Sequence, residues 1–564
     1  MRFCVTPAFT LLLVASPLLA ADDPLDAFPA ETGVVLRIGA PSETSGKVKG
    51  FLNNAAPRYA QLSDSLGPAL GSLIGNPTLA GIDPKRDWYV AVLPRPEKSP
   101  SIVFAVPTAN ADEMKKAIGK TYTFADFESW TIYSLDAEAV GKVSSADRTG
   151  SFRTTLTDRV RKVFDEGEIA IVLNVPSLRN TYQARINTAK EQIVKAATQV
   201  PPGSEATPAM KMGQEYNRKM IEELMKVVED SKAIAENVSI SGDALRFDAI
   251  AVVEAESGSA KFLAKQSPSE LPLLQKLPGG RLAYYDMAGD FSRLMTMSAQ
   301  MTLAAYPMNE KLQALVKDLA NVKFRELAGA FELGDLESGV IRGVSLIDVE
   351  SPEDYRKLAR QMVEAMATSE TAGIKQEMSI TPDAETIEGV KVDLMRAVVA
   401  PAPGNEAAGA AKGVMEIMFG KEGMTQRFAV VDGLFVQGIG EPGVMANAIK
   451  SVRGNGQSDA AALKAAATTR ERLDDKANVL VLFDLPRLMG GAIQLAVESK
   501  RVPLPIDPEA IENLNLAPSY AGLTIAAEQD AARFRTLIPA EQVRGVVELV
   551  NVLQKAAPKR DPAN

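Results

Sequence analysis

The 564-residue sequence contains no histidine and only one cysteine, Cys4. A single cysteine cannot form a disulfide within the chain, so the stability must come from a large packed core, which a chain of this length can supply. Without histidine, neither a Ser-His-Asp nor a Cys-His nucleophile system can exist. The usual zinc, haem and copper sites and a histidine proton shuttle are excluded for the same reason. We therefore expect no cofactor.

Acidic residues also outnumber basic ones. Lys and Arg total 62 against 71 Asp and Glu, which gives a net charge of −9. An acidic chain without long Lys/Arg runs is a poor binder of nucleic acid, so we expect no nucleic-acid partner. Beyond the N-terminal segment the sequence has no apolar run long enough for a transmembrane helix, which needs about 20 residues.

The first 21 residues have the pattern of a secretory signal peptide. Arg2 precedes an apolar stretch through Leu11 to Ala15, and small residues at Ala20 and Ala21 come before the acidic Asp22. The apolar stretch is too short to span a bilayer, although an uncleaved anchor is the alternative. Cys4 lies before this stretch and therefore cannot be a lipoprotein cysteine. We expect an exported protein, in the periplasm or outside the cell.

One strand–turn–helix pattern recurs along the chain. In its clearest copy an apolar run after Asn478 ends at Asp484-Leu-Pro486 and leads into a helix-like segment. An Asp or Asn can cap the helix, and proline suits its first turn. The related stretches are Glu168 to Leu178 with Asn174, Gly280 to Phe291 with Asp286, and Gly33 to Ser42. The unbroken apolar runs indicate strands covered on both faces.

A second repeated pattern is a β-hairpin around Gly-Asp followed by a helix. It occurs at Gly242-Asp243 and again at Gly334-Asp335, and Asp432-Gly433 marks a further hairpin. These repeats predict an α+β fold of two related halves, each a largely antiparallel or mixed sheet with helices packed on it. We expect a signal peptide at 1–21, a first half at 22–275 with a long helical hairpin at about 178–232, a second half at 276–556, and a frayed tail at 557–564.

Motifs for nucleotide or acid–base chemistry are weak. A P-loop has four residues between its first Gly and its Gly-Lys-Ser/Thr, whereas six separate Gly39 from Gly46-Lys47 here, and Val48 replaces the hydroxyl. We therefore expect no nucleotide partner. The acid pairs Asp83/Asp87 and Asp126/Glu128 could serve a glycosidase, but close carboxylates are common in a chain this acidic.

Methionine is the one suggestive enrichment. Met295, Met297 and Met301 crowd one predicted helix. Flexible thioethers suit a pocket for varied apolar ligands, which makes these three residues candidates for ligand binding. The alternative is that they fill ordinary core space.

The combination of these motifs resembles an uncharacterised family of large exported bacterial proteins. The resemblance rests on Phe28-Pro-Ala-Glu-Thr-Gly33 before the first strand, on the strand–Asx-x-Pro–helix junctions, and on Gly81-Ile-Asp83-Pro before Trp88. The family has no established activity, so the resemblance assigns no functional residue.

Two functions follow as hypotheses. The first is a non-catalytic protein of the cell envelope that acts by binding or assembly, with an envelope partner or an apolar, lipid-like ligand. The second is a histidine-free hydrolase that works with carboxylates, such as a glycosidase. The missing nucleophile systems and the duplicated architecture favour the first hypothesis.

Overall fold

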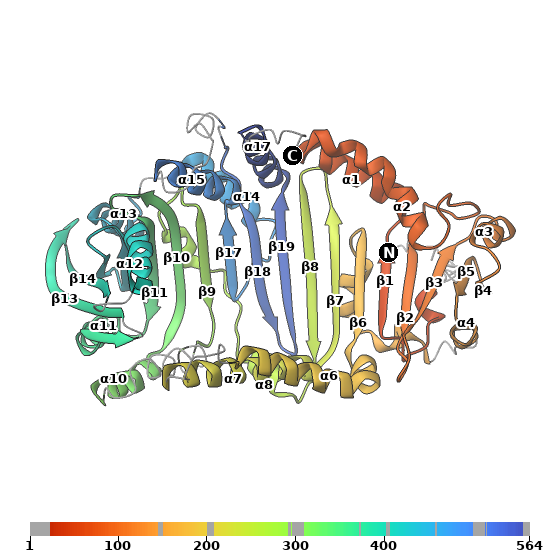
Figure 1. Ribbon diagram of the computed structural model, residues 1–564, viewed down its shortest axis with the longest axis horizontal. Coiled ribbons are helices and arrows are strands. Elements are labelled where there is room, and N and C mark those ends of the chain that lie inside the picture. Colours follow the sequence, from red (N-terminus) through yellow and green to blue (C-terminus); the bar gives the residue numbers. More distant parts are fainter. Residues whose placement is uncertain are drawn as a thin grey trace, which may run out of the picture.

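The structure is a computed structural model, and its elements are strands and helices of one α+β fold. It describes residues 23–144, 150–199, 208–291, 295, 310–371, 374–401, 406–456, 459–499, 514 and 516–556. In the described residues the strands join into a single 19-stranded sheet in which neighbouring strands pair antiparallel (Figure 1). The predicted α+β class is confirmed.

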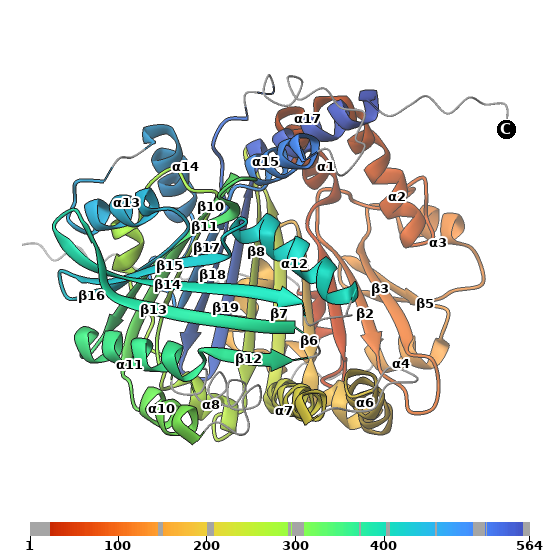
Figure 2. The same cartoon turned by 60° about the vertical axis from the view of Figure 1, so that its left-hand side comes forward.

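The order of the strands across the sheet differs from their order along the chain. From one edge to the other they are β4 (Thr123–Phe127), β5 (Trp130–Ser134), β3 (Ser101–Pro107), β2 (Trp88–Leu93), β1 (Val34–Ile38), β6 (Ile169–Asn174), β7 (Ser231–Ile240), β8 (Ala244–Val253), β19 (Ala531–Pro539), β18 (Ala521–Glu528), β17 (Val479–Phe483), β9 (Ala283–Ala288), β10 (Phe324–Asp335), β11 (Gly339–Val349), β16 (Leu434–Ile439), β15 (Met424–Val431), β14 (Val390–Pro401), β13 (Ile374–Ile387) and β12 (Thr368–Thr371). A sheet this wide must twist and curl. Figure 2 shows β12, β13 and β14 running across the direction of the central strands.

The α-helices connect these strands. In chain order they are α1 (Pro41–Ala55), α2 (Leu66–Leu73), α3 (Ala111–Ile118), α4 (Ala137–Ser144), α5 (Asp158–Asp165), α6 (Val175–Ala197), α7 (Pro208–Asp230), α8 (Gly258–Leu263), α10 (Glu310–Ala320), α11 (Pro352–Ala365), α12 (Glu406–Phe419), α13 (Pro442–Val452), α14 (Ala460–Arg470), α15 (Leu485–Glu498) and α17 (Ala540–Ala556). None of the helices in the described ranges has the length and apolarity needed to cross a membrane.

One face of the sheet is covered along its length and forms the main core. On the N-terminal side, α5 packs Val160, Val163 and Phe164 against inward residues of β1, β6, β7 and β8. On the C-terminal side, α13 packs Met445 and Ile449 against inward residues of β9, β10, β11 and β17. Buried side chains alternate along the central strands, as expected when one face meets a core.

The opposite face is covered only near the two sides of the sheet. At one side, Met114 and Ile118 of α3 cover Trp88 and Tyr133. At the other side, α11 packs against Ile347 and Phe435. Between them no described helix lies over the middle of the strands, where the outward side chains are half-buried or exposed. We call this region the open face; it comprises Ile169, Ile171, Leu173, Ile234, Glu236, Val238, Phe247, Ala249, Ala251, Ala532, Phe534, Thr536, Leu523, Ile525, Val479, Val481, Phe483, Tyr285 and Met287.

The prediction that the apolar strands are covered on both faces is therefore wrong for the centre of the sheet. Alternate residues of β17 are buried at Leu480 and Leu482 and half-buried at Val479, Val481 and Phe483. The sequence hides this difference because both sets of side chains are apolar. In the described part of the chain, the absence of polar alternation in β17 reflects an apolar open face rather than a second covering layer.

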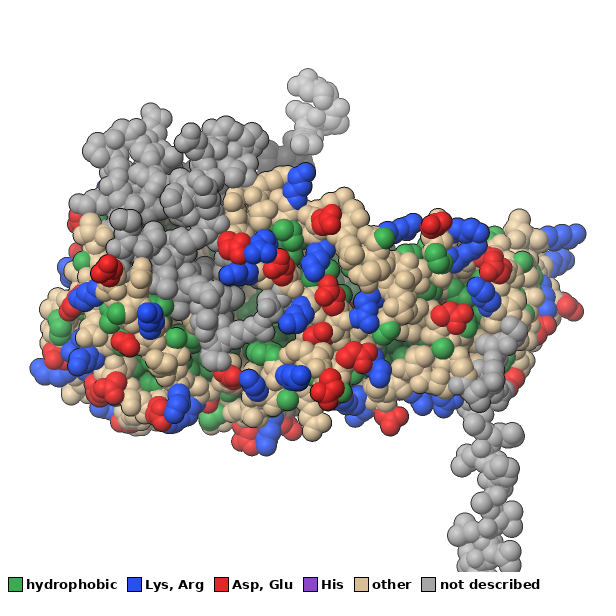
Figure 3. All heavy atoms as spheres, turned by 90° about the horizontal axis from the view of Figure 1, so that it is seen from below, with side chains coloured by type: hydrophobic (Ala, Val, Ile, Leu, Met, Phe, Trp, Pro, Cys, Tyr) green, Lys and Arg blue, Asp and Glu red, His purple; other side chains and the backbone are tan. Residues whose placement is uncertain are grey.

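Two rows of helices stand at the two ends of the central strands (Figure 1). In one row Phe51 and Ala55 of α1 pack with Ala540 of α17 over Ile240 and Leu245, and α15 packs on α17. The other row contains α6, α7 and α8. Figure 3 views the molecule from below and shows Lys and Arg interspersed with Asp and Glu over the described surface on that side.

Local predictions have mixed outcomes. At Asn174 and Asp484 the side chain accepts a hydrogen bond from the helix N-terminus, and proline lies in the first turn, as predicted. Asp286 does not cap a helix, because it lies buried within β9. At the Gly33 to Ser42 copy, α1 begins at Pro41 without a side-chain cap. The hairpins at Gly242-Asp243 and Asp432-Gly433 are present.

The helical hairpin predicted at about 178–232 corresponds to α6 and α7. Each helix has 23 residues, but Ser231 and Lys232 already belong to β7. Residues 200–207, which connect the two helices, lie outside the described residues, as do the predicted tail 557–564 and the signal segment 1–21.

Candidate functional site

An apolar cavity of about 400 Å³ lies at one end of the open face, beside α8. This volume falls within the range of small-molecule pockets, about 300–1,000 Å³. The cavity is lined by Phe262, Leu263, Gln266, Met287, Ala288, Gly289, Asp290, Phe291, Asn478, Val479, Ile525, Ala527 and Ala532. We call it the α8 cavity.

The floor of the α8 cavity follows from strand register. Met287 of β9 pairs with Val479 of β17, which in turn pairs with Ile525 of β18. Neighbouring strands place directly paired residues on the same face, so these three side chains form one continuous apolar row. Ala527 and Ala532 are paired on β18 and β19 and leave room above the sheet because their side chains are small.

The wall of the cavity comes from α8. The Ser257 hydroxyl caps this helix by accepting a hydrogen bond from the Ala260 N–H at 3.0 Å. The Asp230 carboxylate accepts a further N–H bond from Ser259 at 3.0 Å. These contacts fix the first turn, and Phe262 and Leu263 then face the cavity. Phe262 remains 38% exposed, which is a high fraction for a large aromatic side chain.

Two amides lie at the polar rim of the α8 cavity. The Asn478 side chain joins β9 to β18, since its Nδ2 donates to the Ala288 carbonyl at 3.0 Å and its Oδ1 accepts from the Ala527 N–H at 2.9 Å. Oε1 of Gln266 accepts a hydrogen bond from the Asp290 N–H at 3.0 Å, while Nε2 is buried and has no partner.

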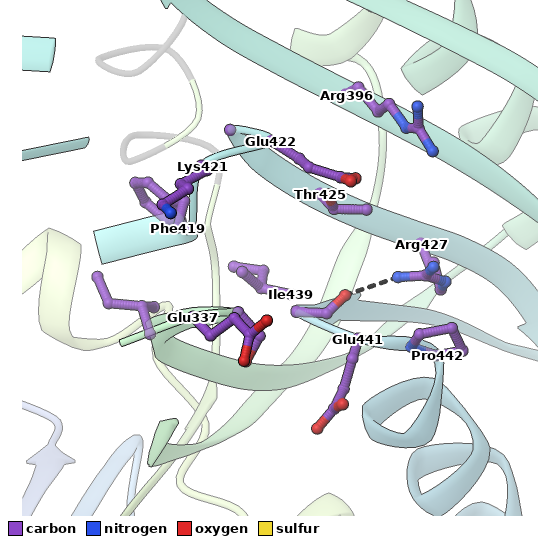
Figure 4. A pocket seen from close by; sticks show the side chains of 15 residues that line it. Glu337, Arg396, Phe419, Lys421, Glu422, Thr425, Arg427, Ile439, Glu441 and Pro442 are labelled. Atoms are coloured by element: carbon purple, nitrogen blue, oxygen red, sulfur yellow. Dashed lines mark hydrogen bonds between the residues drawn. The ribbon is translucent and has the colours of Figure 1, made fainter. Parts of the chain in front are cut away.

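A second, polar cavity of about 520 Å³ lies on the C-terminal side, between β11, β15, β16 and the end of α12. Figure 4 shows Arg396 and Glu422 at one side of it and Glu337 and Glu441 at the other. Arg427 is largely buried at its wall, where it donates to the Glu385 carboxylate at 2.7 Å and to the Gly440 carbonyl at 2.6 Å. Opposite charges are mixed in this cavity rather than grouped.

A pair of buried carboxyl groups lies on the covered face, below Met287. Asp286 is fully buried and Glu326 is 7% exposed, on the neighbouring strands β9 and β10. Oδ2 of Asp286 accepts from the Leu274 N–H at 2.8 Å, and Oε1 of Glu326 accepts from the Leu273 N–H at 2.7 Å. Oδ1 of Asp286 has no separate donor.

Burial raises the pKa of Asp286 to about 8, and the neighbouring Glu326 carboxyl adds to the rise. Burial also raises the pKa of Glu326. Two carboxyl groups in contact are stable when they share a proton, because one can then donate to the other. Neither residue lines either cavity described above. The pair is therefore placed to affect stability rather than to meet a substrate.

The methionines singled out in the sequence do not meet at the α8 cavity in the described chain. Met295 is half-buried and packs against Leu315, Leu319 and Leu358, between α10 and α11. Met297 and Met301 lie outside the described residues. The methionine that does line the cavity is Met287, on β9.

The acid pairs from the sequence are engaged in the scaffold. Asp87 accepts from Arg37 at 2.8 Å and from the Ala40 N–H at 3.0 Å, and Asp83 accepts from the Lys85 N–H. Asp126 pairs with Lys115 at 2.9 Å. The Asp87 contacts hold its loop to β1, and the Asp126 contact joins β4 to α3.

The glycines of the apparent phosphate loop do not form a loop. Gly46 and Lys47 lie within α1, and the Lys47 ammonium pairs with Glu168. Nor do the described residues contain a group of three or more His, Cys, Asp or Glu side chains placed to hold a metal ion.

Sequence reasoning missed most of the cavity-lining residues. Val479 lies inside an apolar run whose sequence indicates where the strand ends, at Asp484, but not which of its residues face the cavity. Phe262 lies in a predicted helix that contains no motif. The usable signal was register: once strands are paired, residues at every second position can be assigned to one face. Register between β17, β18 and β9 depends on contacts far apart in the sequence.

Compared with known proteins, the chain matches no family model, no curated protein and no solved structure.

Proposed function

We propose that this chain is an exported, non-catalytic binding protein of the cell envelope, and that it holds an apolar, lipid-like ligand in the α8 cavity on its open face. The observation that carries the proposal is the cavity itself: an apolar floor on three paired strands, a wall with exposed Phe262, and two amides at the rim. A concave, mostly apolar site with a few polar groups is the usual form of a small-molecule site.

The open face supports the same proposal on a larger scale. Apart from Thr536 and Glu236, its side chains are apolar on seven adjacent strands, and helices rise at both ends of those strands. Soluble proteins rarely leave a contiguous apolar area of this extent without a function for it. The α8 cavity is the place where this face is deep enough to enclose part of a ligand.

We further propose that the fold arose by duplication. Outward from the seam between β8 and β19, the first half has the order β8, β7, β6, β1, β2, β3, β5, β4. The second half has β19, β18, β17, β9, β10, β11, β16, β15, which is the same order when the strands are counted along its own chain without β12, β13 and β14. The junctions at Asn174 and Asp484 then follow equivalent strands, β6 and β17.

The binding proposal is tested by filling the cavity. Ala532 lines it and is half-buried, so Ala532→Trp places a large ring in the space without removing a core side chain. We expect affinity for the neutral apolar probe Nile red, measured by fluorescence titration, to fall at least ten-fold. Native mass spectrometry of gently purified protein should show a bound apolar molecule in the wild type and not in the variant.

Ala249→Trp is the matched control. Ala249 is a half-buried alanine on the same face, paired with Phe534, but it does not line the cavity. We expect its Nile red affinity to stay within two-fold of the wild type. If the wild type does not bind Nile red, or if Ala532→Trp and Ala249→Trp lose binding equally, the α8 cavity is not the binding site.

A carboxylate-based hydrolase is the alternative, and the polar cavity is where it would act. Glu337, Glu422 and Glu441 line that cavity, although Glu441 pairs with Arg342 at 3.0 Å. A screen on cell-wall glycans with Glu337→Gln, Glu422→Gln and Glu441→Gln separates the two functions. Activity that disappears with one of these substitutions would favour the enzyme over the binding protein.

A further inference from the structure

Three turns meet around the polar cavity, and their glycines allow the close approach. Gly339, where the turn after β10 enters β11, and Gly420, which follows α12, have positive φ angles of 101° and 83°. A Cβ at Gly339 would lie 2.5 Å from the backbone carbon of Phe419, so this turn and the end of α12 are in direct contact. The third turn, at Gly440, is held by Arg427, which donates to its carbonyl at 2.6 Å. The cavity therefore has a wall of fixed backbone.

The charges at this cavity are of two kinds. Arg427 belongs to the frame, because it pairs with Glu385 at 2.7 Å, and Glu441 is likewise neutralised by Arg342 at 3.0 Å. In the described chain, the other charged residues of the lining are Arg396, Lys421, Glu337 and Glu422. None of these four side chains is ion-paired or hydrogen-bonded to another described residue. Two cations and two anions thus line one concave space without neutralising one another.

Unpaired charges of opposite sign lie on different sides of the cavity. Arg396 and Glu422 lie at one side, and Glu337 lies at the other (Figure 4). A purely anionic ligand at Arg396 would also meet the carboxylate of Glu422, and a purely cationic ligand at Glu337 would leave Arg396 without a partner. A ligand with a carboxylate at one end and an ammonium group at the other supplies a partner to both sides.

The size of the cavity sets how far apart the two charges of the ligand lie. Two or three residues of extended chain span about 7–11 Å, which is comparable to the width of an equidimensional space of about 520 Å³. A free amino acid carries both charges on one carbon and cannot reach both sides. Phe419 and Ile439 add apolar surface to the lining, where a peptide side chain can pack.

We propose that the polar cavity binds short peptides with two free termini, with the C-terminal carboxylate on Arg396 and the N-terminal ammonium group on Glu337. The guanidinium of arginine suits this role, because its planar fork can bind both oxygens of a carboxylate. The site shares no lining residue with the α8 cavity, so the inference does not depend on a lipid-like ligand there.

Calorimetric titration of the full chain with trialanine, N-acetyl-trialanine and trialanine amide tests the proposal. Acetylation removes the ammonium group and amidation removes the carboxylate. Each change should weaken binding about ten-fold, the factor expected for one charge-assisted hydrogen bond. Free alanine should also bind about ten-fold more weakly than trialanine, because it reaches only one side of the cavity.

Two variants should each erase one preference and keep the other. Arg396→Gln should bind trialanine and its amide equally, while still preferring trialanine over the acetylated peptide. Glu337→Gln should show the reverse pattern. A general loss of folding would lower all affinities together and could not produce this crossed pattern. Lys391→Gln is the matched control, since Lys391 is an exposed cation on the same strand that does not line the cavity, and its affinities should stay within about two-fold of the wild type.

The outcomes decide the proposal. If trialanine does not bind, or if the three peptides bind equally, the polar cavity is not a site for free peptide termini. If both variants keep both preferences, Arg396 and Glu337 do not hold the termini. Mass spectrometry of the recovered peptide should find intact trialanine, whereas its cleavage would favour the hydrolase and overturn a pure binding role.

Discussion

The two ends of the open face differ in what occupies them. At one end Phe51 and Ala55 of α1, with Ala540 of α17, fill the space above Ile240 and Leu245. At the other end, beside α8, the space above Met287 and Ile525 is a cavity of about 400 Å³. Both ends have the same kind of floor, namely outward apolar residues of antiparallel strands. The difference is made by the helix above.

The comparison shows how one scaffold can give both a core and a site. A long helix with a large aromatic residue closes one end, whereas α8, with only six residues, leaves part of the other end uncovered. Close packing of a large buried side chain contributes about several kcal/mol to the free energy of unfolding. The side chains around the cavity lack packing partners on that side and do not contribute this stabilisation. The cavity is therefore a place where the molecule gives up stability, and such a loss is typical of binding sites.

The largest expected effect is obtained by breaking the closed end. Phe51 is 6% exposed, so Phe51→Ala removes a buried ring and should lower the free energy of unfolding by about 3–5 kcal/mol. Chemical denaturation measures this loss. Because the variant also opens space above Ile240 and Leu245, we expect Nile red to bind at two sites instead of one in a stoichiometric titration.

Tyr59→Ala is the control for that experiment, since Tyr59 follows α1 in the chain and is 44% exposed. It should change the stability by less than about 1 kcal/mol and leave one probe site. A Phe51→Ala chain that is as stable as the wild type would show that α1 does not close that end.

The second expected effect is a dependence of stability on pH, and its source is Asp286 on β9, the strand that also carries Met287 of the cavity floor. Because the pKa of Asp286 is raised from 3.8 to about 8, the folded chain keeps a proton that the unfolded chain releases in this interval. The associated stability is fully present below about pH 4 and is lost as pH rises through about 8. We expect a loss of about 2 kcal/mol, less than the full value of about 1.4 kcal/mol per pKa unit, because the neighbouring Glu326 carboxyl shares the titration with Asp286.

Asp286→Asn tests this assignment, since it removes the titrating group and keeps a side chain that can accept from the Leu274 N–H. Denaturation at a series of pH values should give a flatter profile than the wild type between pH 4 and 8. Asp348 and Lys276 also act on Glu326, so Asp348→Asn is the comparison that should leave most of the slope in place. An unchanged slope in Asp286→Asn would exclude Asp286 as its origin.

The smallest effect comes from the helix starts at Asn174 and Asp484. Asn174→Ala removes the cap of α6 and should cost about 1 kcal/mol. Asp484→Ala should cost more, because Asp484 is fully buried and also accepts from Arg487 at 2.6 Å and from the Ser519 N–H at 3.0 Å. Thermal melts of the two variants measure the difference. Equal costs would mean that the two junctions have the same role in spite of their different partners.

Local chemistry made part of this fold predictable. The caps at Asn174 and Asp484, the turn at Asp432-Gly433 and the pair of long helices near 178–232 depend on residues close in the sequence. Asp286 looked like a third cap because its sequence context is similar, yet it lies in the middle of β9 beside Glu326. Its true partner is on another strand, which local pattern cannot identify.

The candidate site was less predictable for the same reason. Its floor needs the register of β9, β17 and β18, which come from distant parts of the chain, and its wall needs the position of α8 relative to β19. Methionine content pointed to an apolar site but to a different helix, whereas Met287 was overlooked in a strand. The composition bears on chemistry only by exclusion, because a sequence without histidine cannot use that residue as a nucleophile's base or as a metal ligand.

The seam between β8 and β19 has a consequence for how the chain reaches its native state. β8 ends at Val253 and β19 begins only at Ala531, and every residue from Ala531 to Pro539 pairs with β8. Until β19 has been synthesised, the edge of β8 has no native neighbour on that side, and long-range strand pairing of this kind forms slowly. The nascent chain therefore presents an unpaired strand edge while residues 254–530 are being made, which is a template for aggregation and a target for holding chaperones.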